Sequence, residues 1–112
     1  MSMWSRLKSL AGGDRTRYTL ASAAALAIPD DTNFVTVTGT TAVTSLSVTA
    51  SARNREITIL GGASAAVSFT NTNSPSAGQM YLRGSDRLVS EDVVLKLLVK
   101  ADGTVTLISF TG

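Results

Sequence analysis

At 112 residues the chain has the length of one domain, and folding at this size buries only about 65% of the surface of the unfolded chain. It contains no cysteine and no histidine, and its formal net charge is +2. These absences exclude disulfides, thiolate metal sites, the common zinc sites and catalytic arrangements that depend on histidine. We therefore expect no enzymatic activity, no cofactor and no metal.

Residues 1–17 are predicted to be a basic amphipathic segment that anchors the domain to a partner. Trp4, Leu7 and Leu10 share one face of a short helix, which the glycines at 12–13 end. The basic side chains of the segment are Arg6, Lys8, Arg15 and Arg17, and with one aspartate they give residues 1–20 a net charge of +3. A helix of at most three turns is unstable alone in water, so it needs a surface on which to dock.

The segment could dock on either of two surfaces. One is a neighbouring subunit, into which Trp4 would insert as an anchor, and the other is the chain's own domain. The positive charge is too sparse to select nucleic acid or anionic lipid over an acidic protein surface. We predict a protein partner, without nucleic acid and without insertion into a membrane.

Residues 18–112 are predicted to form one β domain, which begins with an apolar run of eleven residues at 18–28. A helix that spans a bilayer needs about 20 such residues, so this run is no membrane span. A signal peptide is the alternative, because basic residues precede the run and Ala-x-Ala patterns lie inside it. Asp14 and the glycine pair before the run argue against a leader.

Residues 33–69 contain the same strand–glycine–strand unit twice. A shift of about 22 residues aligns Val35 with Ile57, Val37 with Ile59 and Gly39 with Gly61. Valine and threonine alternate over 34–38, as a half-buried strand requires, and further strands are expected near 43–49, 57–60 and 67–69. The glycines Gly39, Gly61 and Gly62 are predicted to be structural corners. Such a repeat favours stacked rungs, because one unit cannot bury its apolar face alone.

A polar loop at 70–78 follows, with a short strand at 80–82 after it. The residues in this region that could contact a partner or a glycan are Asn71, Asn73, Gln79 and Tyr81. The last third, from residue 91, is predicted to be a β-hairpin that turns at Asp102-Gly103, with a helix over 91–100 as the competitor.

The fold class predicted from these patterns is all-β. We expect a short stacked-rung domain of β-helix or β-prism type, or alternatively a β-sandwich, with a short N-terminal helix or arm. Small side chains, mainly Ser, Thr, Ala and Gly, suit closely stacked β layers.

Four stretches also resemble a known family. They are IPDDTNFVTVTGTTAVTSL, REITILGGASAAVSFTNTNS, a Leu-Arg-Gly turn and EDVVLKLLVKADGTVTLIS. In this order they resemble a module found at the C-terminal ends of tail fibre and tail spike proteins of tailed bacteriophages. The resemblance covers about residues 26–110. It implies a β-helix or β-prism fold, homotrimers, exposure on the virion and no catalytic residues within the module.

Only about 25 residues precede this module, whereas family members carry it behind a long fibre or spike. We therefore expect a small accessory protein of the virion, either a capsid decoration protein or a short head fibre. A tail fibre or tail spike component that contacts the host is the alternative.

Two other functions would each use a different part of the sequence. A carbohydrate-binding module would use the loop residues near Tyr81, although few aromatic side chains are present to stack on sugars. A hydrolase would need carboxylates such as Asp86, Glu91 and Asp92 to act together. Glu91 and Asp92 are adjacent in an expected strand, so their side chains would point to opposite faces and could not share a site.

Overall fold

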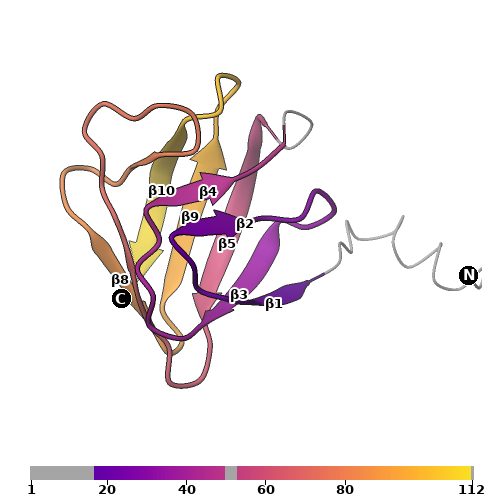
Figure 1. The fold of residues 1–112 in the computed structure, drawn as a ribbon, viewed down its shortest axis with the longest axis vertical. Helices are drawn as coiled ribbons and strands as arrows, with labels where there is room; N and C mark the ends of the chain where they lie inside the picture. The colour runs from indigo at the N-terminus through magenta and orange to yellow at the C-terminus, as the bar shows by residue number, and fades with distance from the viewer. Residues whose placement is uncertain (1–16, 50–52, 112) are drawn as a thin grey trace, which may run out of the picture.

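The computed structural model describes residues 17–49 and 53–111, which form ten β-strands and no helix (Figure 1). The strands are β1 (Tyr18–Ala21), β2 (Ala25–Ala27), β3 (Phe34–Thr38), β4 (Ser45–Ser47), β5 (Arg55–Gly61), β6 (Ala66–Phe69), β7 (Met80–Tyr81), β8 (Arg87–Ser90), β9 (Val94–Val99) and β10 (Val105–Thr111). The all-β prediction is confirmed. The predicted N-terminal helix lies outside the described residues.

The first layer is a six-stranded mixed sheet in the order β1-β3-β5-β9-β10-β7. Strands β1, β3 and β5 run parallel, β9 and β10 form an antiparallel hairpin beside β5, and β7 lies parallel to β10. β1 and β7 are therefore the two edges of this sheet, and the C-terminal strand β10 lies inside it.

The second layer consists of two short ladders. β2 pairs in parallel with β4, and β6 pairs antiparallel with β8. A parallel bridge between Val43 and Phe69 links the residues just before β4 to the end of β6. Figure 1 shows β2 and β4 crossing in front of β9 and β5, so the two layers face each other.

The core lies between these layers and follows the two-residue period of the strands. Alternate residues of β9 are fully buried, namely Leu95, Leu97 and Val99, and Val105 and Leu107 of β10 pair with the last two of them. Phe69 is the largest fully buried side chain of the described residues. The predicted strand in this region is thus confirmed over Val94–Val99, because β-branched residues and the Asp-Gly turn outweigh the helix propensity of leucine and lysine.

The first strands of the two repeated units pair with each other, in a register that differs by two residues from the shift that aligns their sequences. Val35 of β3 pairs with Ile59, and Val37 pairs with Gly61, so paired positions are 24 residues apart. A two-residue slip keeps the same side chains facing the core, which is why the apolar pattern could not distinguish the two registers. Close backbone packing at Gly61 favours the observed one.

Residues 18–28 also belong to this pattern, which the sequence did not reveal. β1 pairs with β3, with Tyr18 opposite Val35, and β2 pairs with β4, with Leu26 opposite Leu46. Alanine disfavours strands and gives no clear alternation, so the run carried no strand signal. The short strand β8 was missed for a similar reason, since four residues are too few to show a period.

Candidate functional site

The loop at 70–79 and strand β7 bring together two of the four predicted contact residues. A depression of about 300 Å³ lies beside them, and it is lined by Asn73, Pro75, Tyr81, Lys100, Val105 and Thr106. Tyr81 is 39% exposed and stands opposite Thr106 in the ladder between β7 and β10. The depression thus combines an aromatic ring with amide, hydroxyl and ammonium groups.

The other two predicted contact residues hold the loop in place instead. The Oδ1 atom of Asn71 accepts hydrogen bonds from the backbone N–H groups of Leu82, at 2.7 Å, and Gly84, at 3.2 Å. Its Nδ2 group donates to Oδ1 of Asn73 at 2.9 Å. Gln79 accepts from the backbone N–H of Ser76 at 2.9 Å. These side chains therefore shape the depression without lining it.

Sequence reasoning did not name four of the lining residues. Pro75 lies inside the loop that was predicted to make contacts, but the sequence carries no signal for the other three. Lys100, Val105 and Thr106 come from the closing hairpin, and they reach Tyr81 only because β7 pairs with β10. That parallel pairing joins positions about 25 residues apart, and no local sequence pattern predicts which distant strands will pair.

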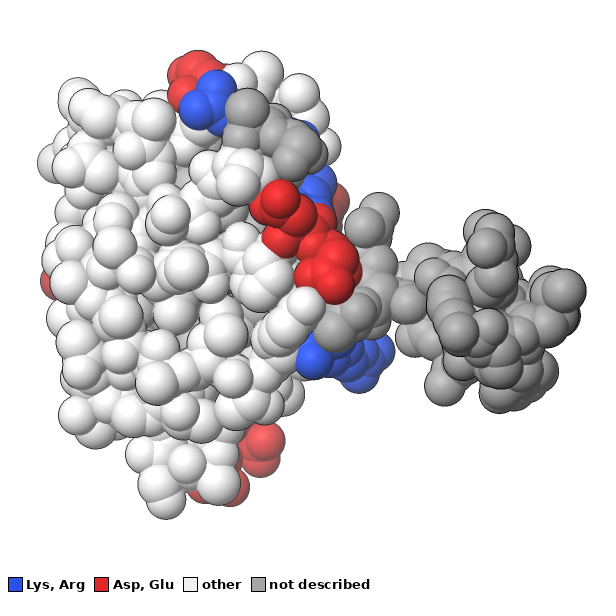
Figure 2. All heavy atoms as spheres, turned by 45° about the vertical axis from the view of Figure 1, so that its right-hand side comes forward, with Lys and Arg blue, Asp and Glu red and all other residues white. Residues whose placement is uncertain are grey.

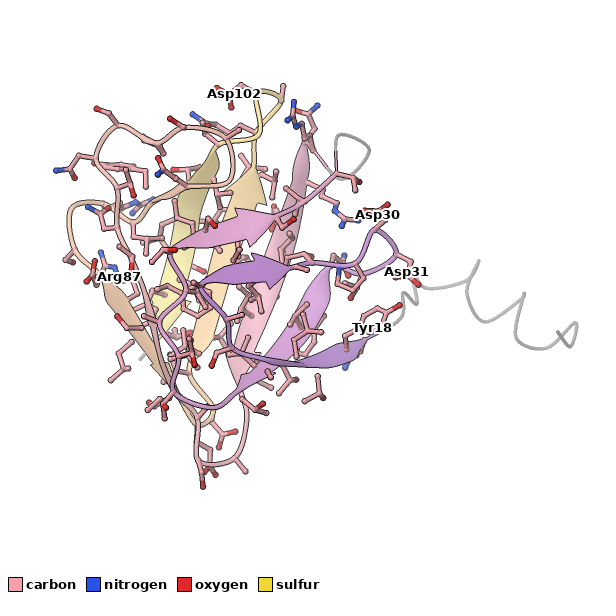
Figure 3. All side chains as sticks on the ribbon, viewed as in Figure 1. Tyr18, Asp30, Asp31, Arg87 and Asp102 are labelled. Atoms are coloured by element: carbon pink, nitrogen blue, oxygen red, sulfur yellow. The ribbon has the colours of Figure 1, made fainter. Side chains whose placement is uncertain are left out.

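The edge of the sheet at β1 carries a second polar cluster. The Arg17 guanidinium lies over the ring of Phe34, 4.8 Å from its centroid. The Tyr18 hydroxyl donates to the Asp31 carboxylate at 2.8 Å, and Figure 3 shows these two side chains next to each other. The hydrogen bond to Asp31 raises the pKa of Tyr18 above its ordinary value of 10.0. Of the predicted anchor residues, only Arg17 belongs to the described part of the chain; Trp4, Arg6, Leu7, Lys8, Leu10 and Arg15 lie outside it.

A broad surface over β2 and β4 carries no charge. The stretches 18–29, 32–52 and 57–82 contain no aspartate, glutamate, lysine or arginine. They supply β2, β4 and β6, and the exposed residues on these strands include Ala25, Ala27 and Ser47. Figure 2 shows the resulting surface, on which lysine, arginine, aspartate and glutamate are confined to the margins. We call it the uncharged face.

The three predicted corner glycines occupy different positions. Gly39 follows β3 with φ of +88°, a conformation that other residues rarely adopt. Gly61 is the last residue of β5, and a Cβ atom there would lie only 1.8 Å from the backbone oxygen of Ser90. At Gly62 a Cβ atom would lie 3.1 Å from the carbonyl oxygen of Val37. Close approach of two backbones therefore accounts for Gly61.

The acidic residues are not gathered into one site. Asp86 and Glu91 lie at opposite ends of β8, where they accept hydrogen bonds from the backbone N–H groups of Asn71 and Ser64. Glu91 and Asp92 form the turn between β8 and β9, with φ of +64° at Asp92, so their expected place in a strand is wrong. Within residues 17–49 and 53–111, no group of three or more acidic side chains could hold a metal ion.

The described residues include no helix long and apolar enough to cross a membrane. No protein-family model, no curated protein and no solved structure matches the chain.

Proposed function

We propose that the chain is a non-enzymatic structural protein of a bacteriophage virion, which forms homotrimers on the particle surface as a capsid decoration protein or short head fibre. In this proposal the body is a short stack of rungs. The parallel pairings β1-β3-β5 and β2-β4 support it, since successive turns of the chain add one strand to each layer.

The uncharged face is the observation that carries the proposal. Charged side chains normally cover about a quarter or more of a soluble surface, and the cores of protein interfaces are depleted of them. Small side chains such as Ala25, Ala27 and Ser47 let two flat strands approach closely. Threefold association through this face is a closed arrangement that covers the same patch on every subunit.

The test is the mass of the purified protein in solution. Light scattering or sedimentation at micromolar concentration should give three times the mass of the chain. The double variant Ala25→Glu, Ala27→Glu should be monomeric, because like charges would meet in the interface. Ser109→Glu is the matched control, since Ser109 is exposed on β10 in the other layer, and it should remain trimeric. A parent protein that is monomeric at these concentrations would contradict the proposal.

Attachment to the particle is assigned to residues 1–17. The core of the described residues runs from Leu26 to Leu107, and we expect it to form without this segment. Deleting residues 1–13 should leave a folded trimer with a nearly unchanged melting temperature that no longer binds particles. A truncated protein that unfolds, or that still decorates particles, would show that the segment packs on its own domain.

A tail fibre or tail spike component is the alternative within the same class. The two locations differ in copy number, which quantitative mass spectrometry of purified particles measures. A decoration protein or head fibre should occur at a copy number comparable with that of the capsid protein, and a tail component at a far lower one.

A further inference from the structure

We propose that the depression beside Tyr81 is a binding site for an acidic saccharide, one that carries a carboxylate on its sugar ring. None of the residues that line the depression belongs to β2, β4 or β6, and the proposal rests on these lining side chains rather than on how the chain assembles. Tyr81, Lys100 and Asn73 are its principal residues.

Tyr81 provides the platform. It is one of two large hydrophobic residues that the described part of the chain leaves exposed, the other being Leu88. Sugar rings carry C–H groups on their faces, which pack on aromatic rings, while their hydroxyl groups require polar partners at the rim. Pro75 and Val105 add apolar wall to the same depression.

The polar groups around the ring are mainly donors. Lys100 is the charged residue among the lining residues, and its ammonium group offers three N–H donors. Asn73 uses its Oδ1 atom to accept from Asn71, which leaves its NH₂ group to donate. Thr106 adds a hydroxyl group. A site with these donors and one positive charge suits a ligand rich in acceptors, so a carboxylate on the sugar gains more than a neutral hydroxyl does.

The walls of the depression are fixed before any ligand arrives. Besides the side-chain bonds of Asn71 and Gln79, the backbone of the loop is tied to both neighbouring strands. Thr72 donates to Met80 at 2.7 Å, Gly78 donates to Gly103 at 2.8 Å, and Val105 donates to Gln79 at 3.0 Å. A preformed site loses less conformational entropy on binding, which favours recognition of a small ligand.

The size and the place of the depression agree with this role. A volume of about 300 Å³ is at the lower end of the range for ligand sites, so it suits one or two sugar rings. β7 lies at the opposite edge of the six-stranded sheet from β1, where residues 1–17 join the domain. A protein held by its N-terminal segment would therefore still present this site to its surroundings.

The experiment uses the full chain on an array of neutral oligosaccharides and oligosaccharides that contain uronic or sialic acids. The best ligand is then titrated by calorimetry. Tyr81→Ala should weaken binding at least about tenfold, whereas Tyr81→Phe should bind like the parent because the ring is retained. Lys100→Gln should abolish the preference for acidic over neutral sugars. Leu88→Ala is the matched control, since it removes the other exposed apolar side chain, and it should leave the affinity unchanged.

Three results would overturn the proposal. They are an array without any binding, a preference for neutral sugars, and a Tyr81→Ala variant that is folded by circular dichroism and binds normally. Amide chemical-shift mapping on the parent protein gives a second test that needs no substitution. Shifts should concentrate at Asn73, Lys100 and Thr106, and shifts confined to the uncharged face would also refute the site.

Discussion

The amide group of Asn71 ties the loop at 70–79 to the segment that follows β7, where it accepts hydrogen bonds from the buried residue Leu82 and from Gly84 in the turn. Asn71→Ala should lower the free energy of unfolding by about 1–3 kcal/mol, because the N–H group of Leu82 would be left without its acceptor in a buried place. Urea denaturation measures this change. Asn73→Ala is the control, since it removes one exposed hydrogen bond, and its effect should stay below about 0.5 kcal/mol. Equal effects of the two substitutions would show that the hydrogen bonds of Asn71 to Leu82 and Gly84 do not stabilise the fold.

A substitution at Gly61 tests whether the fold leaves any space for a side chain at this position. Gly61→Ala should destabilise the protein by about 1–3 kcal/mol or more, since the new methyl group would overlap the backbone of Ser90. Gly84→Ala is the comparison, because a Cβ atom there meets nothing within 4 Å and only the φ of +93° is unfavourable. Thermal melts should rank Gly61→Ala well below Gly84→Ala, and the reverse order would refute close packing as the reason for Gly61.

The same residues show what the sequence could predict about the candidate site. Asn73 and Tyr81 were identified because polar and aromatic residues beside a loop are typical of contact surfaces. Asn71 and Gln79 have the same local appearance, yet their side chains satisfy backbone groups, which only the folded loop reveals. Lys100 and Thr106 carry no local signal, since they reach the site through a pairing between distant strands.

Among the elements, the hairpin of β9 and β10 depends on its turn. Asp102, which lies at the end of the hairpin in Figure 3, accepts hydrogen bonds from the hydroxyl and the backbone N–H of Thr104, at 2.7 and 2.9 Å. These bonds, helped by the charge of Lys100, lower the pKa of Asp102 below its ordinary value of 3.8. The ionised carboxylate is therefore favoured in the folded state, and its contribution to stability is present above that value.

This contribution should disappear as the pH falls through the lowered pKa, which lies below 3.8. The parent protein should exceed Asp102→Asn in stability at neutral pH, and the difference should shrink once the pH is below about 4. Urea midpoints of the two proteins between pH 2 and pH 7 measure it. A difference that does not change over this range would mean that the charge of Asp102 does not support the turn.

Some β-strands could be predicted from the sequence and others could not. β3, β9 and β10 contain alternating valine, leucine or isoleucine, which is the pattern of a half-buried strand. A strong turn dipeptide between β9 and β10 also predicts their hairpin. β1 and β2 are formed by an alanine-rich run, and their strand structure comes from pairing with β3 and β4 rather than from propensity. The pairing register of β3 on β5 could not be predicted from the sequence, because a shift by two residues leaves the apolar pattern unchanged.

For the molecule as a whole, the position of β10 inside the six-stranded sheet makes the C-terminus essential. Deleting residues 105–112 would expose β9 and remove the buried side chains Val105 and Leu107. The truncated chain should lose its cooperative urea transition and its dispersed amide spectrum. The deletion of residues 1–13 at the other end serves as control and should keep both. A soluble, cooperatively folded product without residues 105–112 would show that β1, β3, β5 and β9 suffice to form the sheet.

The interior position of β10 also affects the time course of biosynthesis. Ribosomes add about 5–20 residues per second, and β10 is synthesised after the nine other strands of the described residues. Until then β9 has a vacant edge, and β7 lacks the partner that holds it in the sheet. Nascent chains on one messenger thus display unpaired strands beside one another before any of them can fold completely. Emergence of β10, rather than of the early strands, therefore sets the earliest moment at which the sheet can close.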